Sequence, residues 1–176
     1  MKQTPSPETD KPLKADDIIQ EIMRAGIRFV VFLPDRLTSY HLLNGIFENP
    51  ALRTVPVCKE DEGISICSGL YCTNQRALLL MQYTGLLDSI NSLRGVAVQM
   101  KNPVCMMVGL LGKEPGVEPT RSARYGLRIV EPILDAMGIE HHLLERPEDL
   151  AKFVPAVESA YARSEPVVLL IGTEPV

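Results

Sequence analysis

The chain has 176 residues, of which 45% are hydrophobic and 23% are charged. This length and balance are typical of one folded α/β domain and exclude a disordered or fibrous protein. The formal net charge of -4 at pH 7 includes no long basic run, so the sequence gives no electrostatic support for nucleic-acid binding.

The chain begins with a polar stretch that carries prolines, and we expect residues 1–14 to be a flexible tail ahead of one domain at 15–176. This stretch lacks the apolar segment of a signal peptide. No later apolar run approaches the roughly 18 to 20 residues that cross a bilayer. The sequence therefore predicts a soluble, cytoplasmic protein.

Helices and strands are expected to alternate from Asp16 or Asp17, either of which can cap a helix that stops at Gly26. The run Ile27–Leu33 that follows is nearly continuous, apolar and β-branched, as in a strand covered on both faces. The later predicted elements, in chain order, are helix 39–47, strand 54–57, helix 60–72, strand 77–81, helix 87–99, strand 104–110, helix 127–137, strand 139–144, helix 147–161 and strand 167–171. This alternation predicts an α/β fold: a doubly wound, mainly parallel six-stranded sheet with helices on both faces.

Ligands of such sheets bind beyond the carboxyl ends of the strands, so the loops at that edge are the expected place for a site. The polar segment 112–125 is too long for a simple connection and is a candidate functional loop. Another loop carries three acidic residues at the start of a helix, Glu60, Asp61 and Glu62. Acidic residues stabilise helix N-termini, which can account for Asp61 and Glu62. Glu60 stands directly at the strand-to-helix junction, where its side chain can point across the edge of the sheet.

The cysteines and histidines give no sign of a metal or redox site. The four cysteines are Cys58, Cys67, Cys72 and Cys105. They form no C-x-x-C pair and have no histidine at metal-ligand spacing, so we expect buried thiols in a reducing cytosol and no metal bound by this chain. His141 and His142 fall within a predicted strand, and structural roles are expected for both.

Two stretches of the sequence are characteristic in combination: 59–69, KEDEGISICSG, and 81–91, MQYTGLLDSIN. Together they resemble the pyrimidine-binding domain of thiamine-diphosphate enzymes, and in particular the alpha subunits of sulfopyruvate decarboxylases and the related phosphonopyruvate decarboxylases. Further matching segments are Leu33-Pro34-Asp35, GKEPG at 112–116 and LDAMGI at 134–139. The resemblance covers about residues 13–172 and implies the thiamine-diphosphate-binding fold.

The catalytic glutamate of this family lies nine positions before the glycine of its first helix, and Glu60 has that spacing from Gly69. Glu62, which directly precedes Gly63, is the alternative. The resemblance implies that this glutamate hydrogen-bonds N1′ of the cofactor's aminopyrimidine and promotes the imino tautomer that removes the thiazolium C2 proton. The resulting ylide attacks the 2-oxo carbon of the substrate, and the cofactor accepts electrons as carbon dioxide leaves.

Other site residues follow from the same resemblance and from the charge of the expected substrate. The predicted cofactor-binding residues besides Glu60 are Gln82, Thr84, Gly85 and Leu86. Asp35 is expected to face the reacting carbon. Candidate counter-charges for an anionic 2-oxo acid are Arg36, His41, Lys113, Arg121 and Arg124. The sequence departs from the family at Tyr83-Thr84 and Leu87-Asp88, where the family has Asn-Ser and Gly-Asn, and this leaves the substrate open.

The sequence contains no Gly-Asp-Gly motif, which thiamine-diphosphate enzymes use with a later asparagine to hold the diphosphate through Mg²⁺. The resemblance therefore implies a partner beta subunit that carries this motif and the Mg²⁺ ligands, in a hetero-oligomer of α2β2 or larger size. The expected activity is decarboxylation of sulfopyruvate to sulfoacetaldehyde, or of a phosphonopyruvate-like substrate. A carboligase or lyase subunit that uses the same cofactor, and a catalytically inert regulatory module of the same fold, are the alternatives.

Overall fold

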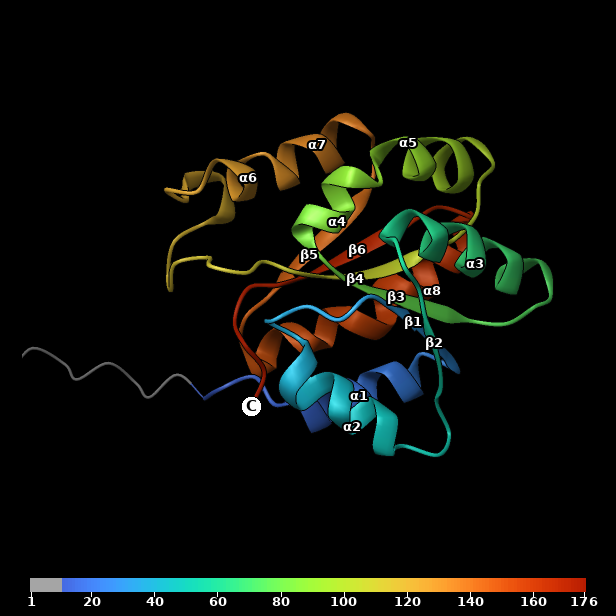
Figure 1. Ribbon diagram of the computed structural model, residues 1–176, viewed down its shortest axis with the longest axis horizontal. Coiled ribbons are helices and arrows are strands. Elements are labelled where there is room, and N and C mark those ends of the chain that lie inside the picture. The colour runs from blue at the N-terminus through green and yellow to red at the C-terminus, as the bar shows by residue number, and fades with distance from the viewer. Residues whose placement is uncertain (1–10) are drawn as a thin grey trace, which may run out of the picture.

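A computed structural model describes residues 11–176, apart from the side chains of Ser39 and Tyr40. At its centre is a six-stranded sheet in which every pairing between neighbouring strands is parallel. Helices cover both faces of this sheet (Figure 1), which confirms the predicted fold class.

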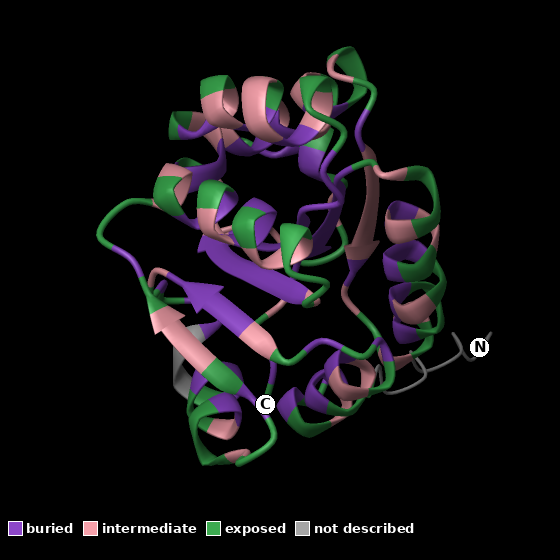
Figure 2. Cartoon of the chain, turned by 90° about the vertical axis from the view of Figure 1, so that its right-hand side faces the viewer, coloured by how far each residue is buried: buried purple, intermediate pink, exposed green. Residues whose placement is uncertain are grey.

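The strands follow the order β2-β1-β3-β4-β6-β5 across the sheet. They are β1 Phe29–Phe32, β2 Arg53–Pro56, β3 Ala77–Gln82, β4 Cys105–Gly109, β5 Glu140–Leu144 and β6 Val167–Ile171. The inner strands are almost entirely buried, whereas β2 and β5 are the partly exposed edges (Figure 2). The winding direction reverses at β1, because β2 lies on one side of it and β3 on the other. Such a reversal leaves a crevice at the carboxyl ends of the strands, where a ligand can bind.

Alternate residues of each inner strand face two separate apolar cores, as expected for a sheet that is covered on both sides. Val30 and Leu78 face the first core, and Val31 and Leu79 face the second. Val31 is paired in register with Leu79, so the neighbouring inner strands β1 and β3 contribute matching rows of side chains to each core.

The first core is covered by the N-terminal and C-terminal helices. These elements are α1 Ala15–Arg24, the π-helix η1 Ser39–Leu43, α2 Asn44–Glu48, the 3-10 helix η4 Pro147–Lys152 and α8 Phe153–Arg163. The apolar face predicted for the first helix is buried, namely Ile18, Ile19 and Ile22. The predicted cap is wrong, because the N-cap residue is Lys14 and no side chain caps the helix. Asp16 and Asp17 lie within the first turn instead, where their carboxylates interact favourably with the helix dipole.

The second core is covered by the helices from the middle of the chain. These elements are α3 Glu60–Cys72, α4 Tyr83–Asp88, α5 Ile90–Ser92, the π-helix η2 Leu93–Gln99, α6 Tyr125–Arg128 and α7 Val130–Ala136. Helix α3 lies very close to β3 because Gly63 has no side chain; a Cβ atom there would lie 2.4 Å from Cδ1 of Leu79. This close approach fixes the N-terminus of α3 at the edge of the sheet.

Most predicted elements exist, and α3 and β6 have the predicted bounds. The helix expected at 87–99 begins earlier than predicted. The helical run starts with α4 at Tyr83 and continues through α5 and η2. Gly85 therefore lies inside a helix rather than in a turn. The reason is Leu86, whose side chain is buried in the second core and anchors this early helical turn to the sheet.

The two ends of the described chain lie together. The backbone N–H of Val176 donates to the carbonyl of Leu13, and the N–H of Ala15 donates to the carbonyl of Val176. Leu13 is 1% exposed in the first core, so the packed part of the chain begins no later than Leu13, within the segment expected to be a tail. The rest of that expected tail, residues 1–10, lies outside the described residues. None of the helices in residues 11–176 combines the length and the apolar character that a membrane-spanning helix needs.

Candidate active site at the carboxyl edge of the sheet

The side chains that follow β1, β2 and β3 converge at the reversal of strand order. Asp35 follows β1, Glu60 begins α3 directly after β2, and α4 begins at Tyr83 directly after β3. Contacts between α3 and α4 bring the second and third of these segments together. This junction is the place where ligands bind in open parallel sheets.

The three acidic residues at the start of α3 have different environments. Oε2 of Glu62 accepts hydrogen bonds from the backbone N–H groups of Cys58 at 3.0 Å and Lys59 at 3.4 Å. Oδ1 of Asp61 accepts from the backbone N–H of Glu62 at 3.0 Å. Both carboxylates thus satisfy N–H groups that the beginning of a helix leaves open. Their contacts are those of capping groups.

Glu60 has no such partner. Its side chain is half-buried, and it forms no hydrogen bond or ion pair with the residues that the structure describes. It lies across the backbone of α4, where a Cβ atom on Gly85 would be only 2.1 Å from Oε1 of Glu60. The carboxylate therefore sits between two helix N-terminal turns with its acceptor oxygens available to a ligand.

Other glycines at the carboxyl edge also make room for charged side chains. A Cβ atom on Gly109 would lie 3.2 Å from Oδ1 of Asp35. At Gly112 it would lie 2.5 Å from Cζ of Arg124, and at Gly172 it would lie 2.5 Å from Oε1 of Glu145. Glycine at these positions lets charged groups from neighbouring loops lie directly on the backbone.

Asp35 lies beside Gly109 at the end of β4, and its carboxylate is already engaged. Oδ1 accepts from the backbone N–H groups of Leu37 at 2.6 Å and Thr38 at 3.1 Å, and the hydroxyl of Thr38 donates to Oδ2. The residue is 7% exposed. These contacts make Asp35 the organiser of the turn that follows β1.

Lys113 does not present a free charge to the site. Its side chain is 1% exposed, and its Nζ donates to Oε1 of Glu145 and to the carbonyl of Glu114 at 3.2 Å. The ion pair ties the loop after β4 to the end of β5. Among the predicted counter-charges, Lys113 is therefore better explained as a structural cation.

The remaining predicted counter-charges lie in different places. Arg36, Arg121 and Arg124 are exposed, and Arg124 lies over Gly112 at the end of β4. His41 lies elsewhere, in a groove beside the start of α1, helix α2 and Val176. The three arginines are therefore at the surface, whereas His41 lines a groove on the side of α1 and α2.

The predicted cofactor-binding residues besides Glu60 lie at the junction of β3 and α4, where Gln82 ends β3 and Thr84, Gly85 and Leu86 belong to α4. The hydroxyl of Thr84 donates to Oε1 of Gln82 at 2.9 Å, and Gly85 lies under Glu60. The side chain of Leu86 is 1% exposed and belongs to the second core. Only the backbone of Leu86 can therefore reach a ligand at this edge.

Sequence reasoning missed two polar contacts around the site. Nζ of Lys59 lies 3.3 Å from Oδ2 of Asp88, and this contact with Asp88 is the main cause that raises the pKa of Lys59. In the loop after β4, Glu114 accepts from the hydroxyl of Ser122 at 2.7 Å and from the N–H of Ala123 at 3.0 Å. The hydrogen bond from Ser122 is the main cause that lowers the pKa of Glu114. Neither pair has a local spacing that a sequence pattern could identify.

The histidines of β5 have local partners. Nδ1 of His141 lies 3.1 Å from the carbonyl of Ile139, and Nε2 of His142 lies 2.9 Å from Oε1 of Glu140. Among the described residues, no group of three or more His, Cys, Asp or Glu side chains is arranged to hold a metal ion.

The thiols are only partly as expected. Cys67 and Cys105 are buried, and burial raises the pKa of the Cys105 thiol to about 12. The expectation of buried thiols is wrong for Cys58 and Cys72, which are exposed because they lie at the two ends of α3.

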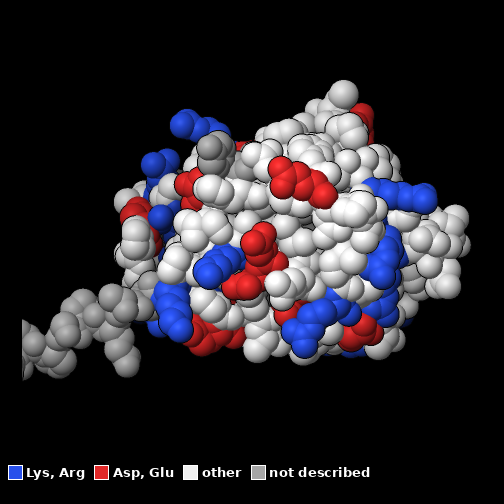
Figure 3. Space-filling view, turned by 90° about the horizontal axis from the view of Figure 1, so that it is seen from below, with Lys and Arg blue, Asp and Glu red and all other residues white. Residues whose placement is uncertain are grey.

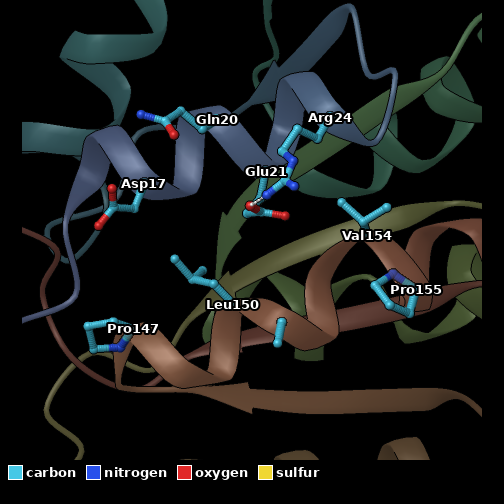
Figure 4. A pocket seen from close by; sticks show the side chains of 9 residues that line it. Asp17, Gln20, Glu21, Arg24, Pro147, Leu150, Val154 and Pro155 are labelled. Atoms are coloured by element: carbon cyan, nitrogen blue, oxygen red, sulfur yellow. Dashed lines mark hydrogen bonds and ion pairs between the residues drawn. The ribbon is translucent and has the colours of Figure 1, made fainter.

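A groove of about 780 Å³ lies on the opposite face of the sheet from Glu60, between α1 and the η4–α8 segment (Figure 4). One wall carries polar side chains of α1, including the Glu21–Arg24 ion pair, and the other carries Leu150, Val154 and Pro155. Acidic and basic side chains are interspersed on the face below α1 and α2 rather than gathered by sign (Figure 3). Neither feature adds a charged site to the one at Glu60.

Curated relatives of this chain carry the name expected from the sequence, although no protein-family model matches it. The sulfopyruvate decarboxylase subunit alpha of Methanococcus maripaludis is 24% identical over 159 residues, which are 89% of this chain and 93% of that protein. The subunit of the same name from Methanocaldococcus jannaschii is 28% identical over 131 residues, 74% of this chain and 76% of that protein. The sulfopyruvate decarboxylase of Methanosarcina acetivorans is 27% identical over 160 residues, and this chain spans only 39% of its length. The predicted resemblance to sulfopyruvate decarboxylase alpha subunits is thus confirmed.

The fold is similar to that of a solved structure, the 2-oxoglutarate:ferredoxin oxidoreductase from Magnetococcus marinus. The TM-score is 0.69 at 14% sequence identity, and the match covers 96% of this chain. It covers 30% of the other chain, so this domain corresponds to one part of a larger protein. At this identity, the likeness concerns the fold alone.

Proposed function

We propose that this chain is the alpha subunit of a thiamine-diphosphate-dependent decarboxylase that acts on an anionic 2-oxo acid, with Glu60 as the carboxyl that activates the cofactor. Sulfopyruvate is the first candidate substrate, in line with the names of the relatives, and a phosphonopyruvate-like acid is the second. The observation that carries this proposal is the half-buried Glu60 carboxylate, which forms no hydrogen bond or ion pair with the described residues and lies over Gly85 at the reversal of strand order.

The residues around Glu60 fit an aminopyrimidine ring. A protonated ring nitrogen needs a carboxylate acceptor, and the oxygens of Glu60 are not committed to other described groups. Gln82 at the end of β3 and Thr84 on α4 add amide and hydroxyl groups, and Gly85 leaves backbone surface uncovered. These residues and Glu60 would hold the ring. When bound, thiamine diphosphate supplies a carbon acid and an acceptor for the electrons that loss of carbon dioxide releases.

The role of Glu60 is to hold a proton between its carboxyl and the ring nitrogen. A ring and a partner surface that cover this half-exposed side chain would remove water from it, and desolvation favours the neutral, proton-sharing form of a carboxyl. Asp61 and Glu62 are unsuitable for this role because their oxygens accept backbone hydrogen bonds at the start of α3. This difference is the reason for choosing Glu60 over Glu62.

The substrate's negative charge would be met by arginines rather than by Lys113. Arg36, Arg121 and Arg124 are exposed, and guanidinium groups bind carboxylate and sulfonate-like oxygens through paired hydrogen bonds. Arg124 has the best position because its side chain lies on Gly112 at the carboxyl end of β4. Asp35 would act by shaping the loop after β1.

A separate beta subunit would supply the diphosphate site and its Mg²⁺, in an α2β2 or larger cytoplasmic assembly. Two findings support this proposal. This sequence has no Gly-Asp-Gly motif, and two relatives that it spans almost fully or largely are named as alpha subunits. This chain spans 39% of the Methanosarcina acetivorans relative, so more than half of that polypeptide is left for a second domain.

The test is decarboxylation by the purified complex of this chain with its partner, thiamine diphosphate and Mg²⁺. We expect carbon dioxide release from sulfopyruvate, and a loss of about 100-fold or more for Glu60→Gln, which removes the proton-sharing carboxyl. Glu62→Gln is the matched control, since glutamine can replace glutamate in a helix cap, and it should stay near the wild-type rate. Wild-type turnover by Glu60→Gln, or equal losses in both variants, would refute the role of Glu60.

The same assay separates the two alternatives. A carboligase or lyase would consume the 2-oxo acid and form a longer or differently cleaved product, also in a manner that depends on Glu60. A regulatory module would alter the partner's activity equally well with Glu60→Gln as with the wild-type chain. Either result would replace the decarboxylase proposal.

A further inference from the structure

The contact between Glu60 and Gly85 involves more than the tip of the glutamate. A Cβ atom on Gly85 would lie 2.1 Å from Oε1, 2.2 Å from Cδ and 2.4 Å from Cγ of Glu60. These separations are far below the 3.5 to 4.0 Å at which non-bonded heavy atoms attract each other. The outer half of the Glu60 side chain thus occupies the volume that any side chain at position 85 would need.

We propose that Gly85 is a positioning residue for Glu60: the absence of a side chain at position 85 leaves the space that the carboxyl occupies in the junction between α3 and α4. An alanine there would force Glu60 into another rotamer and out of this junction. The catalytic consequence rests on the proposed function, whereas the steric relation stands on the geometry of the chain alone.

The backbones on either side of this contact have little freedom to move apart. Helix α3 is anchored against β3 by Ile64 and Cys67, whose side chains are buried in the second core. Helix α4 is anchored by the buried side chain of Leu86. The Lys59–Asp88 pair, at 3.3 Å, links the start of α3 to the end of α4. The side chain of Glu60 is the least constrained part of the contact, so it is the part that an added Cβ displaces.

A glycine inside a helix is otherwise a disadvantage. After proline, glycine is the least favourable residue inside a helix, because its backbone loses the most freedom on folding. Gly95, in the helical run that follows α4, has no atom within 4 Å of the position that a Cβ would take. It provides a control in which the same substitution adds a methyl group without displacing a charged side chain.

The first experiment is structural and needs no cofactor. Crystal structures of the full chain with Gly85→Ala and with Gly95→Ala are compared with the wild-type chain, and their melting temperatures are measured. We expect Glu60 to leave the α3–α4 junction in Gly85→Ala only. If Gly85→Ala fails to fold, the double variant Gly85→Ala/Glu60→Ala should recover the folding transition. A Glu60 that keeps its place in Gly85→Ala, or a double variant that stays unfolded, would overturn the proposal.

The second experiment uses the complex with the partner subunit and tests whether the two residues act as one unit. We expect Gly85→Ala to lose about 100-fold in turnover, as a misplaced catalytic group does, and Gly95→Ala to stay near the wild-type rate. Adding Glu60→Gln to Gly85→Ala should cost little more, because both changes act through the same carboxyl. Multiplied losses in the double variant would mean that position 85 acts independently of Glu60, against the proposal.

The outcomes distinguish the two proposals. If Glu60 moves in Gly85→Ala but no assembled complex shows activity that depends on Glu60, the positioning relation holds and the proposed function fails. If Glu60→Gln abolishes turnover while Gly85→Ala behaves like Gly95→Ala, the proposed function holds and the positioning relation fails.

Discussion

Glu60 and Glu62, on either side of Asp61, differ in their hydrogen bonding to the rest of the protein. Glu62 satisfies backbone N–H groups at the start of α3, and Glu60 leaves its oxygens free of described partners. Glu62→Ala should therefore lower the free energy of unfolding by about 1 kcal/mol, the usual cost of a lost N-terminal cap. Urea unfolding of the isolated chain measures this loss.

The companion variant is Glu60→Ala, which removes no cap. We expect its free energy of unfolding to stay within about 0.5 kcal/mol of the wild-type value, as for surface changes away from special features. Equal destabilisation by the two substitutions would contradict the assignment of the capping role to Glu62 rather than Glu60.

Lys113 is a buried cation whose main partner is Glu145. Its side chain is 1% exposed, whereas that of Glu145 is 23% exposed, so water still reaches part of the pair. Lys113→Met removes the cation and leaves the carboxylate of Glu145 partly buried, which should cost about 2 kcal/mol, less than the 3 to 5 kcal/mol of a fully buried pair. Urea unfolding at neutral pH measures the difference.

The matched control is the more exposed pair of Lys152 with Asp149, in which Nζ and Oδ1 are 2.8 Å apart and the lysine side chain is 48% exposed. Lys152→Met should cost about 0.5 kcal/mol or less. If the two methionine variants lose the same stability, Lys113 is not the structural tie between the loop after β4 and the end of β5.

At the scale of the elements, the packing of α3 against β3 depends on Gly63. A Cβ there would lie 2.4 Å from Cδ1 of the fully buried Leu79, so Gly63→Ala overpacks the second core. The expected cost is about 1 to 3 kcal/mol in the free energy of unfolding. Gly69→Ala in the same helix meets no atom within 4 Å and should instead stabilise the chain by up to about 1 kcal/mol. If Gly63→Ala and Gly69→Ala change the free energy of unfolding in the same direction, this account of the packing is wrong.

The elements with the clearest local signals were predictable from the sequence. The apolar run Val167–Ile171 and the helix Glu60–Cys72, with an acidic start, have the predicted bounds. The start of α4 was not predictable, because Gly85 has a low helix propensity and glycine is frequent in turns. Burial of Leu86 against the sheet decides the conformation there, and burial is a tertiary property that local propensity does not contain.

The candidate site was predictable only in part, because the partners of its charged side chains depend on tertiary structure. A spacing of nine residues from Gly69 selected Glu60 over Glu62, and that choice stays a prediction; in the structure, Glu62 accepts hydrogen bonds from backbone N–H groups ahead of α3. The resemblance selected Asp35, and the charge of the expected substrate selected Lys113, but a sequence does not reveal which charged groups already have partners. Glu145, the partner of Lys113, becomes visible only when the loops after β4 and β5 lie side by side, whereas Leu37 and Thr38 engage Asp35 within its own loop.

At the scale of the whole molecule, two cores share one sheet, and each core contains one buried thiol whose reactivity can be measured. Cys105 belongs to the first core, and Cys67 belongs to the second. Burial raises the pKa of both thiols, that of Cys105 to about 12, so almost none of either is the reactive thiolate at pH 8. Cys58 and Cys72 are exposed and provide internal references for fast reaction.

We therefore expect a disulfide reagent such as 5,5′-dithiobis(2-nitrobenzoic acid) to modify two thiols of the native chain quickly at pH 8 and all four in concentrated urea. At intermediate urea, Cys67 and Cys105 should become reactive at the same rate, because a domain whose two cores share every inner strand opens as one cooperative unit. Mass spectrometry of the labelled peptides follows each cysteine separately. Earlier labelling of Cys67 would show that the layer containing α3, α4 and Glu60 opens before the other, and the sheet would then not couple the two cores.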